Sequence, residues 1–287
     1  MNKLSFNPIQ EVLDDGLEIP EVGEWGIEKY KCLGYYAEIF TKSMSKKWNN
    51  LVYIDLFASS GYCKIKKTNR IIKSGALISL SVTIPFKRYI FCEEDENLLN
   101  SLQQRVKRDY PNVDAHFISG DCNLKILDII NLIPKYSSNN TVLSFAFIDP
   151  FRLNINFRTV QMLCAYRMDI LMLIATGMAA TRNAKRYQNP TNETIAKFLD
   201  DNNWRSSYQG EADLNDQSFT QFLAATYKAN LEKLGYTKAS DFHAVRYRQN
   251  NMNVLLYHLA FFSKDKLGNT FWDIVRTQYS GEQTSMF

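Results

Sequence analysis

The sequence predicts an α/β fold built on a mostly parallel sheet with helices on both faces. Four apolar segments each end in a carboxylate and a turn, and they follow one another at intervals of roughly 30 residues, the length of a βα unit. Because parallel strands point the same way, the four acids should meet at the carboxyl edge of the sheet, where ligands of doubly wound folds bind. The four segments are Val52–Gly61, Phe91–Asp95, Ser119–Asn123 and Phe145–Phe151.

The first part of the chain predicts one helix and then alternating strands and helices. Leu33, Tyr36 and Phe40 recur at helical spacing within residues 26–48, which indicates an amphipathic helix before the sheet. Asp95 suits the positively polarised start of a helix. The predicted strands are 51–56, 87–92, 113–118, 142–148 and 169–175, and the predicted helices between them are 75–83, 95–110, 122–134 and 156–166.

The later part of the chain changes character from about residue 178. Polar helical segments are predicted first, followed by two strands, 241–249 and 253–262, around the turn Gln249–Asn251. Such a pair predicts an antiparallel hairpin at one edge of the sheet. We therefore expect an N-terminal helical extension (1–50) and one Rossmann-like domain (51–287) with a helical, substrate-facing insertion (178–240). The polar helical segments are 178–187, 191–201 and 215–234.

The composition excludes several classes of protein. Of the 287 residues 45% are hydrophobic and 22% are charged, and the net charge of +4 is too mild to identify a nucleic-acid binder by itself. No stretch approaches the roughly 20 apolar residues needed to cross a bilayer. The N-terminus has no apolar signal core, so we expect a cytoplasmic protein that does not bind membranes. The five cysteines and three histidines lack metal-ligand spacing, which predicts buried, reduced thiols and no metal.

Three of the strand-end acids and the loop after the first strand predict a site for S-adenosylmethionine (SAM). The loop lets backbone N–H groups approach the methionine end of SAM. Glu93 would accept hydrogen bonds from the ribose hydroxyls, and Asp121 would recognise the adenine amine. A dinucleotide site is the weaker interpretation because the loop is not G-x-G-x-x-G. The alternatives are a helix cap for Asp55 and a solvated strand end for Glu93. The predicted cofactor-binding residues are Asp55, Phe57, Ala58, Ser59, Gly61, Glu93, Asp121 and Cys122.

The fourth segment predicts the type of reaction. In amino-methyltransferases a D/N-P-P-Y/F turn presents oxygen atoms to the target nitrogen and an aromatic face to the substrate ring. Asp149, Pro150 and Phe151 keep the acid, one proline and the aromatic residue, so we assign them as candidate catalytic residues. Holding the amine against the sulfonium methyl group supplies much of the acceleration. Phe151 would stack on the substrate base. The alternative is that Pro150 ends the strand and Phe151 packs inside.

These segments together resemble the three-Cys-motif partner (TcmP) family. The resemblance implies a class I SAM-dependent methyltransferase that works with a partner protein containing three clustered cysteines. The D-P-aromatic turn also resembles that of guanine-N2 tRNA methyltransferases, which favours a nucleobase amine. The matching segments are KYKCLGYYAEIF (29–40), YIDLFASSG (53–61), FCEED (91–95), GDCN (120–123), FIDPF (147–151) and YHLAFFSKDKLGNTFW (257–272).

The chain departs from the family pattern at two places. The family usually reads D-L-F-A-G-x-G, but Ser59 and Ser60 stand here in place of Gly-x. A Cβ at position 59 predicts either crowding of the cofactor carboxylate or a different loop conformation. A glycine usually follows the D-P-aromatic turn, but Arg152 stands here, which predicts a phosphate contact or altered catalysis.

Basic residues gather on both sides of the predicted site. Residues 64–73 carry five basic side chains directly after the Gly61 loop, and a second group follows the apolar run 170–175. Phosphate contacts would give sequence-independent, salt-sensitive affinity. The alternative for Lys66 and Lys67 is a solvated loop. The predicted nucleic-acid-binding residues are Lys64, Arg70, Lys73, Arg152, Arg182 and Arg186.

The last five residues resemble the Q-x-S/D-L/M-F peptides by which bacterial replication and repair proteins bind the sliding clamp. Gln283, Met286 and Phe287 would be the anchors of this contact. The alternative is a frayed or packed C-terminus.

The sequence thus predicts a SAM-dependent methyltransferase that acts on an amine, a nucleobase of DNA or RNA, together with a partner protein. The process would be DNA repair, modification or phage defence. The alternative is a catalytically inactive, methyltransferase-like subunit that binds nucleic acid and recruits a partner.

Overall fold

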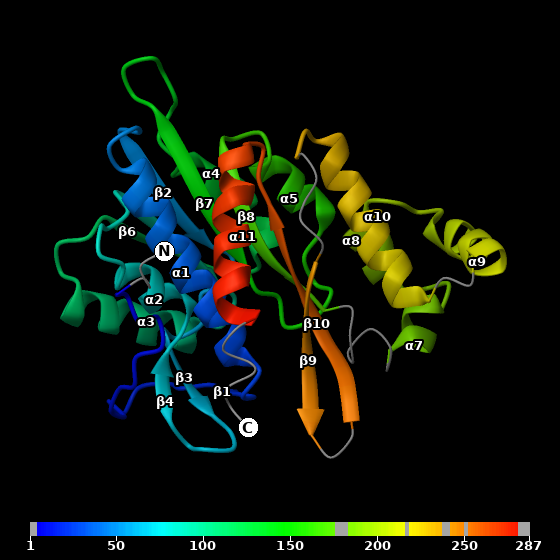
Figure 1. The fold of residues 1–287 in the computed structure, drawn as a ribbon, viewed down its shortest axis with the longest axis horizontal. Coiled ribbons are helices and arrows are strands. Elements are labelled where there is room, and N and C mark those ends of the chain that lie inside the picture. Colours follow the sequence, from blue (N-terminus) through cyan, green and yellow to red (C-terminus); the bar gives the residue numbers. More distant parts are fainter. Residues whose placement is uncertain (1–4, 176–182, 216–217, 237–241, 250–251, 281–287) are drawn as a thin grey trace.

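The computed structural model describes residues 5–175, 183–215, 218–236, 242–249 and 252–280. Its centre is a seven-stranded sheet with the strand order β6-β5-β2-β7-β8-β10-β9 (Figure 1). The strands are β2 (Asn50–Asp55), β5 (Arg88–Glu93), β6 (Ala115–Ser119), β7 (Val142–Ile148), β8 (Met168–Ile174), β9 (His243–Gln249) and β10 (Met252–Phe262).

One strand of this sheet is reversed. Neighbours from β6 to β8 pair in parallel, whereas β10 pairs antiparallel with both β8 and β9. Counted along the chain, the seven strands lie in the order 3-2-1-4-5-7-6. This arrangement confirms the predicted α/β fold, a Rossmann-like sheet of the class I methyltransferase type with an antiparallel hairpin at its C-terminal edge.

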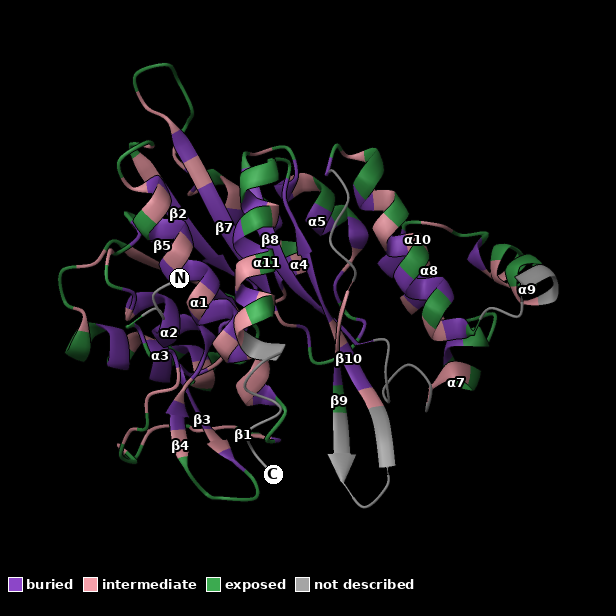
Figure 2. Cartoon of the chain, viewed as in Figure 1, coloured by how far each residue is buried: buried purple, intermediate pink, exposed green. Residues whose placement is uncertain are grey.

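The central strands are mostly apolar because both faces of the sheet are covered. Every residue of β8 is buried, and the middle of the sheet is buried along its length (Figure 2). On one face, Tyr36 packs against Phe145 and Phe261, and Phe261 stacks on Trp272. These contacts join α1 (Gly26–Met44) and α11 (Lys266–Ser280), which lie side by side in front of the sheet in Figure 1.

The helices between the strands have clear local causes. Asp95 caps α3 by accepting hydrogen bonds from the N–H groups of Asn97 and Leu98 at 2.8 and 3.2 Å. Leu99, Leu102 and Val106 then form its buried stripe. These helices are α2 (Gly75–Leu80), α3 (Glu96–Asp109), α4 (Cys122–Asn131) and α5 (Phe157–Leu163).

A second, three-stranded sheet with the order β1-β3-β4 was not predicted. It contains β1 (Glu21–Val22), β3 (Tyr62–Ile65) and β4 (Ile71–Lys73), so residues 62–73 form a hairpin rather than a loop. Lysines dominate this segment, but Cys63, Ile65 and Ile72 are buried in a small apolar cluster of their own. Their alternation marks a half-buried strand.

The C-terminal part contains two helices that were not predicted, α9 (Trp204–Asn215) and α11. Figure 1 shows α7 (Ala184–Gln188), α8 (Thr194–Leu199), α9 and α10 (Phe219–Lys233) grouped to one side of the sheet. Asn189, Asn192 and Asn203 form the turns between the shorter helices.

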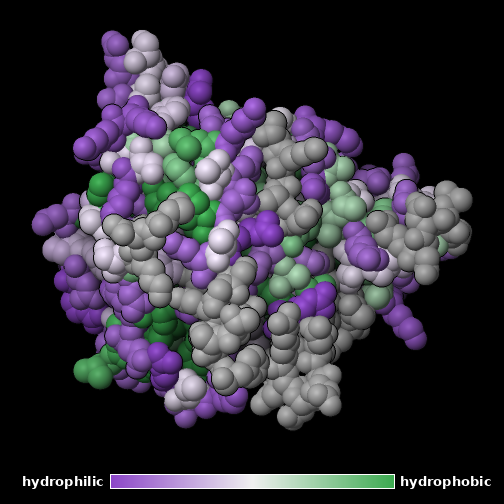
Figure 3. Space-filling view, viewed as in Figure 1, coloured by the Kyte–Doolittle hydropathy of each residue, from purple (hydrophilic) through white to green (hydrophobic). Residues whose placement is uncertain are grey.

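The remaining features concern the surface and the thiols. Across the parts of the chain that the structure describes, no helix is long and apolar enough to cross a membrane. The five cysteines are free and buried, as predicted. The coloured part of the face in Figure 3 is largely hydrophilic, with hydrophobic atoms gathered at its upper left and lower left. A cavity of about 550 Å³ at the amino edge of the strands is lined by Phe40, Met44, Leu143 and Phe271 among others.

Candidate functional site

A cavity of about 720 Å³ opens at the carboxyl edge of the parallel strands. This volume lies within the range of small-molecule sites. Three of the four strand-end acids, Asp55, Glu93 and Asp149, line it together. Two basic side chains, Lys29 and Lys66, also line it, so the acids outnumber the bases. The remaining acidic lining residues are Glu21 and Glu94.

The loop after β2 forms part of the cavity wall. Phe57, Ala58 and Ser59 line the cavity, and the Ala58 N–H donates to the Cys92 carbonyl at 2.9 Å. Ser59 has a φ of +56°, in the left-handed region that favours glycine. The loop therefore keeps a glycine-like conformation although a serine occupies the position, at the cost of local backbone strain.

Glu93 fixes this loop to the next strand. One carboxylate oxygen accepts the Ser59 N–H at 2.7 Å, and the other accepts the Asp95 N–H at 3.1 Å. An ionised carboxylate has about four acceptor positions, so both oxygens keep capacity for a ligand's hydroxyl groups. Glu93 is thus more than a solvated strand end.

Asp55 is almost completely buried at the end of β2. Its carboxylate accepts the Phe57 N–H at 3.1 Å and lies 3.2 Å from the Tyr53 hydroxyl. Burial raises the pKa of this carboxyl from 3.8 to about 8, against the lowering effect of the Phe57 hydrogen bond; the negative charge of Asp149 raises it further. It caps no described helix, contrary to the alternative interpretation.

Gly75 allows this close packing. A Cβ there would lie 3.1 Å from both Asp55 Oδ2 and the Phe147 ring. The start of α2 therefore approaches Asp55 more closely than a larger residue would allow.

Three predicted cofactor residues lie behind or beside the cavity, outside its described lining. Gly61, with a φ of +87°, packs against Leu77 and Leu102. Asp121 caps α4 by accepting the Asn123 N–H at 2.8 Å, and Cys122 is buried. A cofactor role for these three residues stays a prediction.

The candidate catalytic turn lies at the end of β7, and Asp149, Pro150 and Phe151 all line the cavity. Phe151 is 87% exposed, so it does not pack inside as the alternative interpretation required. Asp149 forms an ion pair with Lys29 of α1, and each of these side chains is 13% exposed. The cavity thus presents a paired acid beside an exposed aromatic ring.

Sequence reasoning missed Lys29 and the other cavity residues of the N-terminal region. Lys29 lies on the same helix face as Leu33, Tyr36 and Phe40, which are buried. A lysine one turn before an apolar stripe was the available signal. The start of α1 is held at the site by Tyr257, which donates to the Trp25 carbonyl at 2.7 Å, and by the 2.5 Å contact between His243 and Glu28.

The predicted basic patch on the β3–β4 hairpin is partly used within the protein. Arg70 pairs with Glu11 at 2.5 Å, and Lys73 donates to the hydroxyls of Ser81 and Tyr110 at 2.9 and 3.1 Å. Lys64 is half-buried in β3. Lys66 is exposed and borders the cavity, which places one cation of this segment at its mouth.

Arg152 and Arg186 are exposed and lie outside the described lining of the cavity. Burial raises the pKa of Tyr187, and the two guanidinium charges oppose that rise, so both lie near it. Arg182 and the tail residues Gln283, Met286 and Phe287 lie outside the described residues.

Metal ligation has no support in the described part of the chain, where no group of three or more His, Cys, Asp or Glu side chains could hold an ion.

Comparisons with known proteins support the fold. No protein-family model and no curated protein matches this chain. Among solved structures, protein LPL1258 from Legionella pneumophila is similar, with a TM-score of 0.51 and 8% identity over 88% of this chain and 91% of that chain. Trm1 from Pyrococcus horikoshii in complex with S-adenosyl-L-methionine has a TM-score of 0.46 and 9% identity over 88% of this chain and 61% of that one. The first similarity shows the fold alone, and the second adds no argument about the site.

Proposed function

We propose that this protein is a SAM-dependent methyltransferase that acts on an amine, a nucleobase of DNA or RNA. The observation that carries the proposal is the meeting of Asp55, Glu93 and Asp149 in one cavity, at the carboxyl edge of a class I methyltransferase-like sheet. The resemblance to the TcmP family supports the same conclusion, since the motifs that carry it supply these acids.

The lining residues fit this cofactor chemically. SAM carries a sulfonium and an ammonium group, and the cavity has more acidic than basic side chains. Glu93 would accept hydrogen bonds from the ribose hydroxyls with its remaining acceptor positions, and residues 57–59, which line the cavity, would pack against the methionine end. Asp55 would lie near the ammonium group, whose charge favours the ionised carboxylate.

The turn at the end of β7 would orient the substrate. When bound, SAM supplies an electrophilic methyl group, and the sulfur keeps the electron pair of the broken C–S bond. Asp149 would accept a hydrogen bond from the target amine while the new N–C bond forms, and would take the proton that this nitrogen loses. Phe151 would stack on the base from its exposed position. Lys29 binds one oxygen of the Asp149 carboxylate, which leaves acceptor positions for the amine.

The basic residues around the cavity would hold the nucleic-acid backbone. Lys66, Arg152 and Arg186 are exposed, whereas Arg70 and Lys73 already have partners. We infer that these three exposed cations contribute most of the salt-sensitive affinity. The family resemblance supports a partner protein with three clustered cysteines, and the tail at Gln283, Met286 and Phe287 supports a second contact with the sliding clamp.

One observation favours the second candidate, a non-catalytic subunit that binds nucleic acid and recruits a partner. The ion pair with Lys29 already engages one oxygen of Asp149, the acid that an amine substrate would need. Cofactor binding separates the two candidates, because a scaffold that has lost catalysis need not retain it.

The test is transfer of a tritiated methyl group from SAM to DNA and to RNA by the wild-type protein, Asp149→Ala and Asp114→Ala. Asp114 pairs with Arg88 at 2.8 Å outside the cavity lining and serves as the matched acidic control. We expect transfer by the wild type and the control and loss in Asp149→Ala. Equal transfer by Asp149→Ala would show that the catalytic assignment is wrong.

A further inference from the structure

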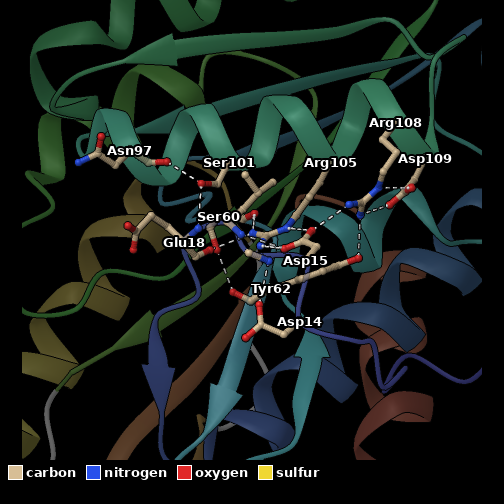
Figure 4. Close-up of polar contacts among 12 residues, drawn as sticks. Asp14, Asp15, Glu18, Ser60, Tyr62, Asn97, Ser101, Arg105, Arg108 and Asp109 are labelled. Atoms are coloured by element: carbon tan, nitrogen blue, oxygen red, sulfur yellow. Dashed lines mark hydrogen bonds and ion pairs between the residues drawn. The ribbon is translucent and has the colours of Figure 1, made fainter.

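A fully buried arginine, Arg105 of α3, lies behind the loop that follows β2 (Figure 4). We call this loop, residues 57–61, the cofactor loop. The Arg105 guanidinium makes four hydrogen bonds, and its carbon lies 4.1 Å from the centre of the Tyr62 ring. A buried ion pair contributes little net stability compared with apolar residues of the same volume. Its value here therefore lies in the geometry that it imposes.

The first partner of Arg105 is the loop that follows β2. Its Nη1 donates to the Ser60 carbonyl at 2.7 Å, one residue before Gly61. The preceding residue, Ser59, is the left-handed position whose N–H faces Glu93. Arg105 thus holds the loop from behind while Glu93 holds it from the cavity side.

The second partner is the N-terminal segment 5–23, which we call the strap. Asp15 binds Arg105 through both oxygens, at 2.6 and 2.9 Å, and the Glu18 carbonyl accepts Nη1 at 3.0 Å. Arg108 donates to the same Asp15 carboxylate at 2.9 Å, and Ser101 accepts the Glu18 N–H at 3.2 Å. Figure 4 shows these groups converging beneath α3.

The strap continues directly into the cavity wall. Residues 20–23 line the cavity, and β1 within them pairs in parallel with β3, with Glu21 opposite Lys64. Nearer the start of the strap, Pro8 packs closely on α1. A Cβ added at Gly34 of that helix would lie 2.3 Å from the Cβ of Pro8. One guanidinium therefore joins the cofactor loop to the segment that forms the opposite wall.

We propose that Arg105 is a positioning residue for the cofactor, and that it holds the Ser59–Gly61 loop and the strap at the spacing that SAM requires. This inference rests on the proposed function. Lysine cannot replace it, because an ammonium group lacks the planar fork that binds Asp15 through two bonds while reaching two carbonyls. Because coupling is reciprocal, a bound cofactor must in turn stabilise the strap.

The test compares Arg105→Lys with Arg88→Lys by calorimetric titration with S-adenosylhomocysteine (SAH). Arg88 is the matched control, since it binds Asp114 and the Leu132 carbonyl, both at 2.8 Å, but does not line the cavity. We expect Arg105→Lys to bind SAH about tenfold more weakly or worse, a typical coupling magnitude. We expect Arg88→Lys to bind as the wild type does, even if it unfolds at a similarly lowered temperature.

Hydrogen exchange supplies a readout that a purely structural role would not change. SAH should slow exchange in the strap of the wild type and have little effect there in Arg105→Lys. If Arg105→Lys does not fold, Ser101→Ala takes its place, because it removes the partner of the Glu18 N–H. It should weaken SAH binding and reduce the slowing of strap exchange by SAH, each by less than Arg105→Lys would.

The outcomes distinguish the two levels of the proposal. If the wild type and Arg105→Lys bind SAH equally well, the positioning role is wrong and the cofactor assignment stands. Where Arg105→Lys does not fold, equal binding by Ser101→Ala leads to the same conclusion. If the wild type binds no SAH, both are wrong.

Discussion

The burial of Asp55 predicts a distinct pH dependence of stability. Its pKa is about 8 in the folded protein, against an ordinary value of 3.8, chiefly because burial disfavours the charged form. Between these two values the unfolded chain has lost the proton and the folded protein retains it. The free energy of unfolding therefore falls as the pH rises through this window, by about 1.4 kcal/mol per pH unit.

Asp55→Asn tests this reasoning because an asparagine stays neutral at every pH. Its amide can accept the Phe57 N–H and donate to the Tyr53 hydroxyl, so both contacts of the neutral carboxyl remain. From pH 5 to pH 7, the stability of Asp55→Asn relative to the wild type should rise by about 2.8 kcal/mol, two pH units of the slope above. Urea unfolding at both pH values measures it.

Asp109→Asn is the control for this experiment. The hydrogen bond from Arg108 at 2.7 Å is the largest effect on the pKa of Asp109 and holds it below its ordinary value, so this acid is ionised in both states between pH 5 and pH 7. Its relative stability should not change over this interval. A flat difference for Asp55→Asn as well would show that Asp55 is ionised in the folded protein, and would refute the burial argument.

Two further predictions concern the cavity. Ser59→Gly should raise the free energy of unfolding by about 0.5 kcal/mol, because it removes the strain of a φ of +56° and the gain exceeds the added backbone entropy; urea unfolding that shows a loss would contradict the strained loop. Phe151→Ala should leave stability within about 0.5 kcal/mol, since the ring is 87% exposed, but should raise KM for a polynucleotide substrate by an amount equivalent to about 1–3 kcal/mol of lost stacking. An unchanged KM would exclude Phe151 from substrate binding.

The sequence predicted the sheet and its strand-end acids because those signals are local. Continuous apolar runs mark strands that are buried on both faces, and the acid at the end of each run shows its direction. The sequence alone therefore predicts that one edge of the sheet carries Asp55, Glu93 and Asp149. The antiparallel C-terminal pair followed from its turn and strand lengths.

The features that were missed depend on tertiary contacts. Lys29 and Asp149 are separated by 120 positions, and their contact depends on how α1 crosses β7. Arg105 reads as a solvated residue on an amphipathic helix, and it becomes buried because the strap covers that face. The β3–β4 hairpin was hidden by its lysines, since exposed basic residues mask the apolar alternation of Cys63, Ile65 and Ile72.

Calorimetric titration of SAH into the wild type and Glu93→Gln tests the central claim most directly. This substitution replaces one acceptor oxygen of Glu93 with an amide nitrogen, which can only donate. The side chain can then no longer accept hydrogen bonds with both of its terminal atoms, so it loses an acceptor either for the ribose or for the Ser59 N–H, which Glu93 accepts at 2.7 Å. We expect micromolar binding by the wild type and binding weaker by about tenfold or more in the variant, a typical cost of an unpaired buried group. Absence of binding by the wild type, or equal binding by both proteins, would contradict a cofactor site in this cavity.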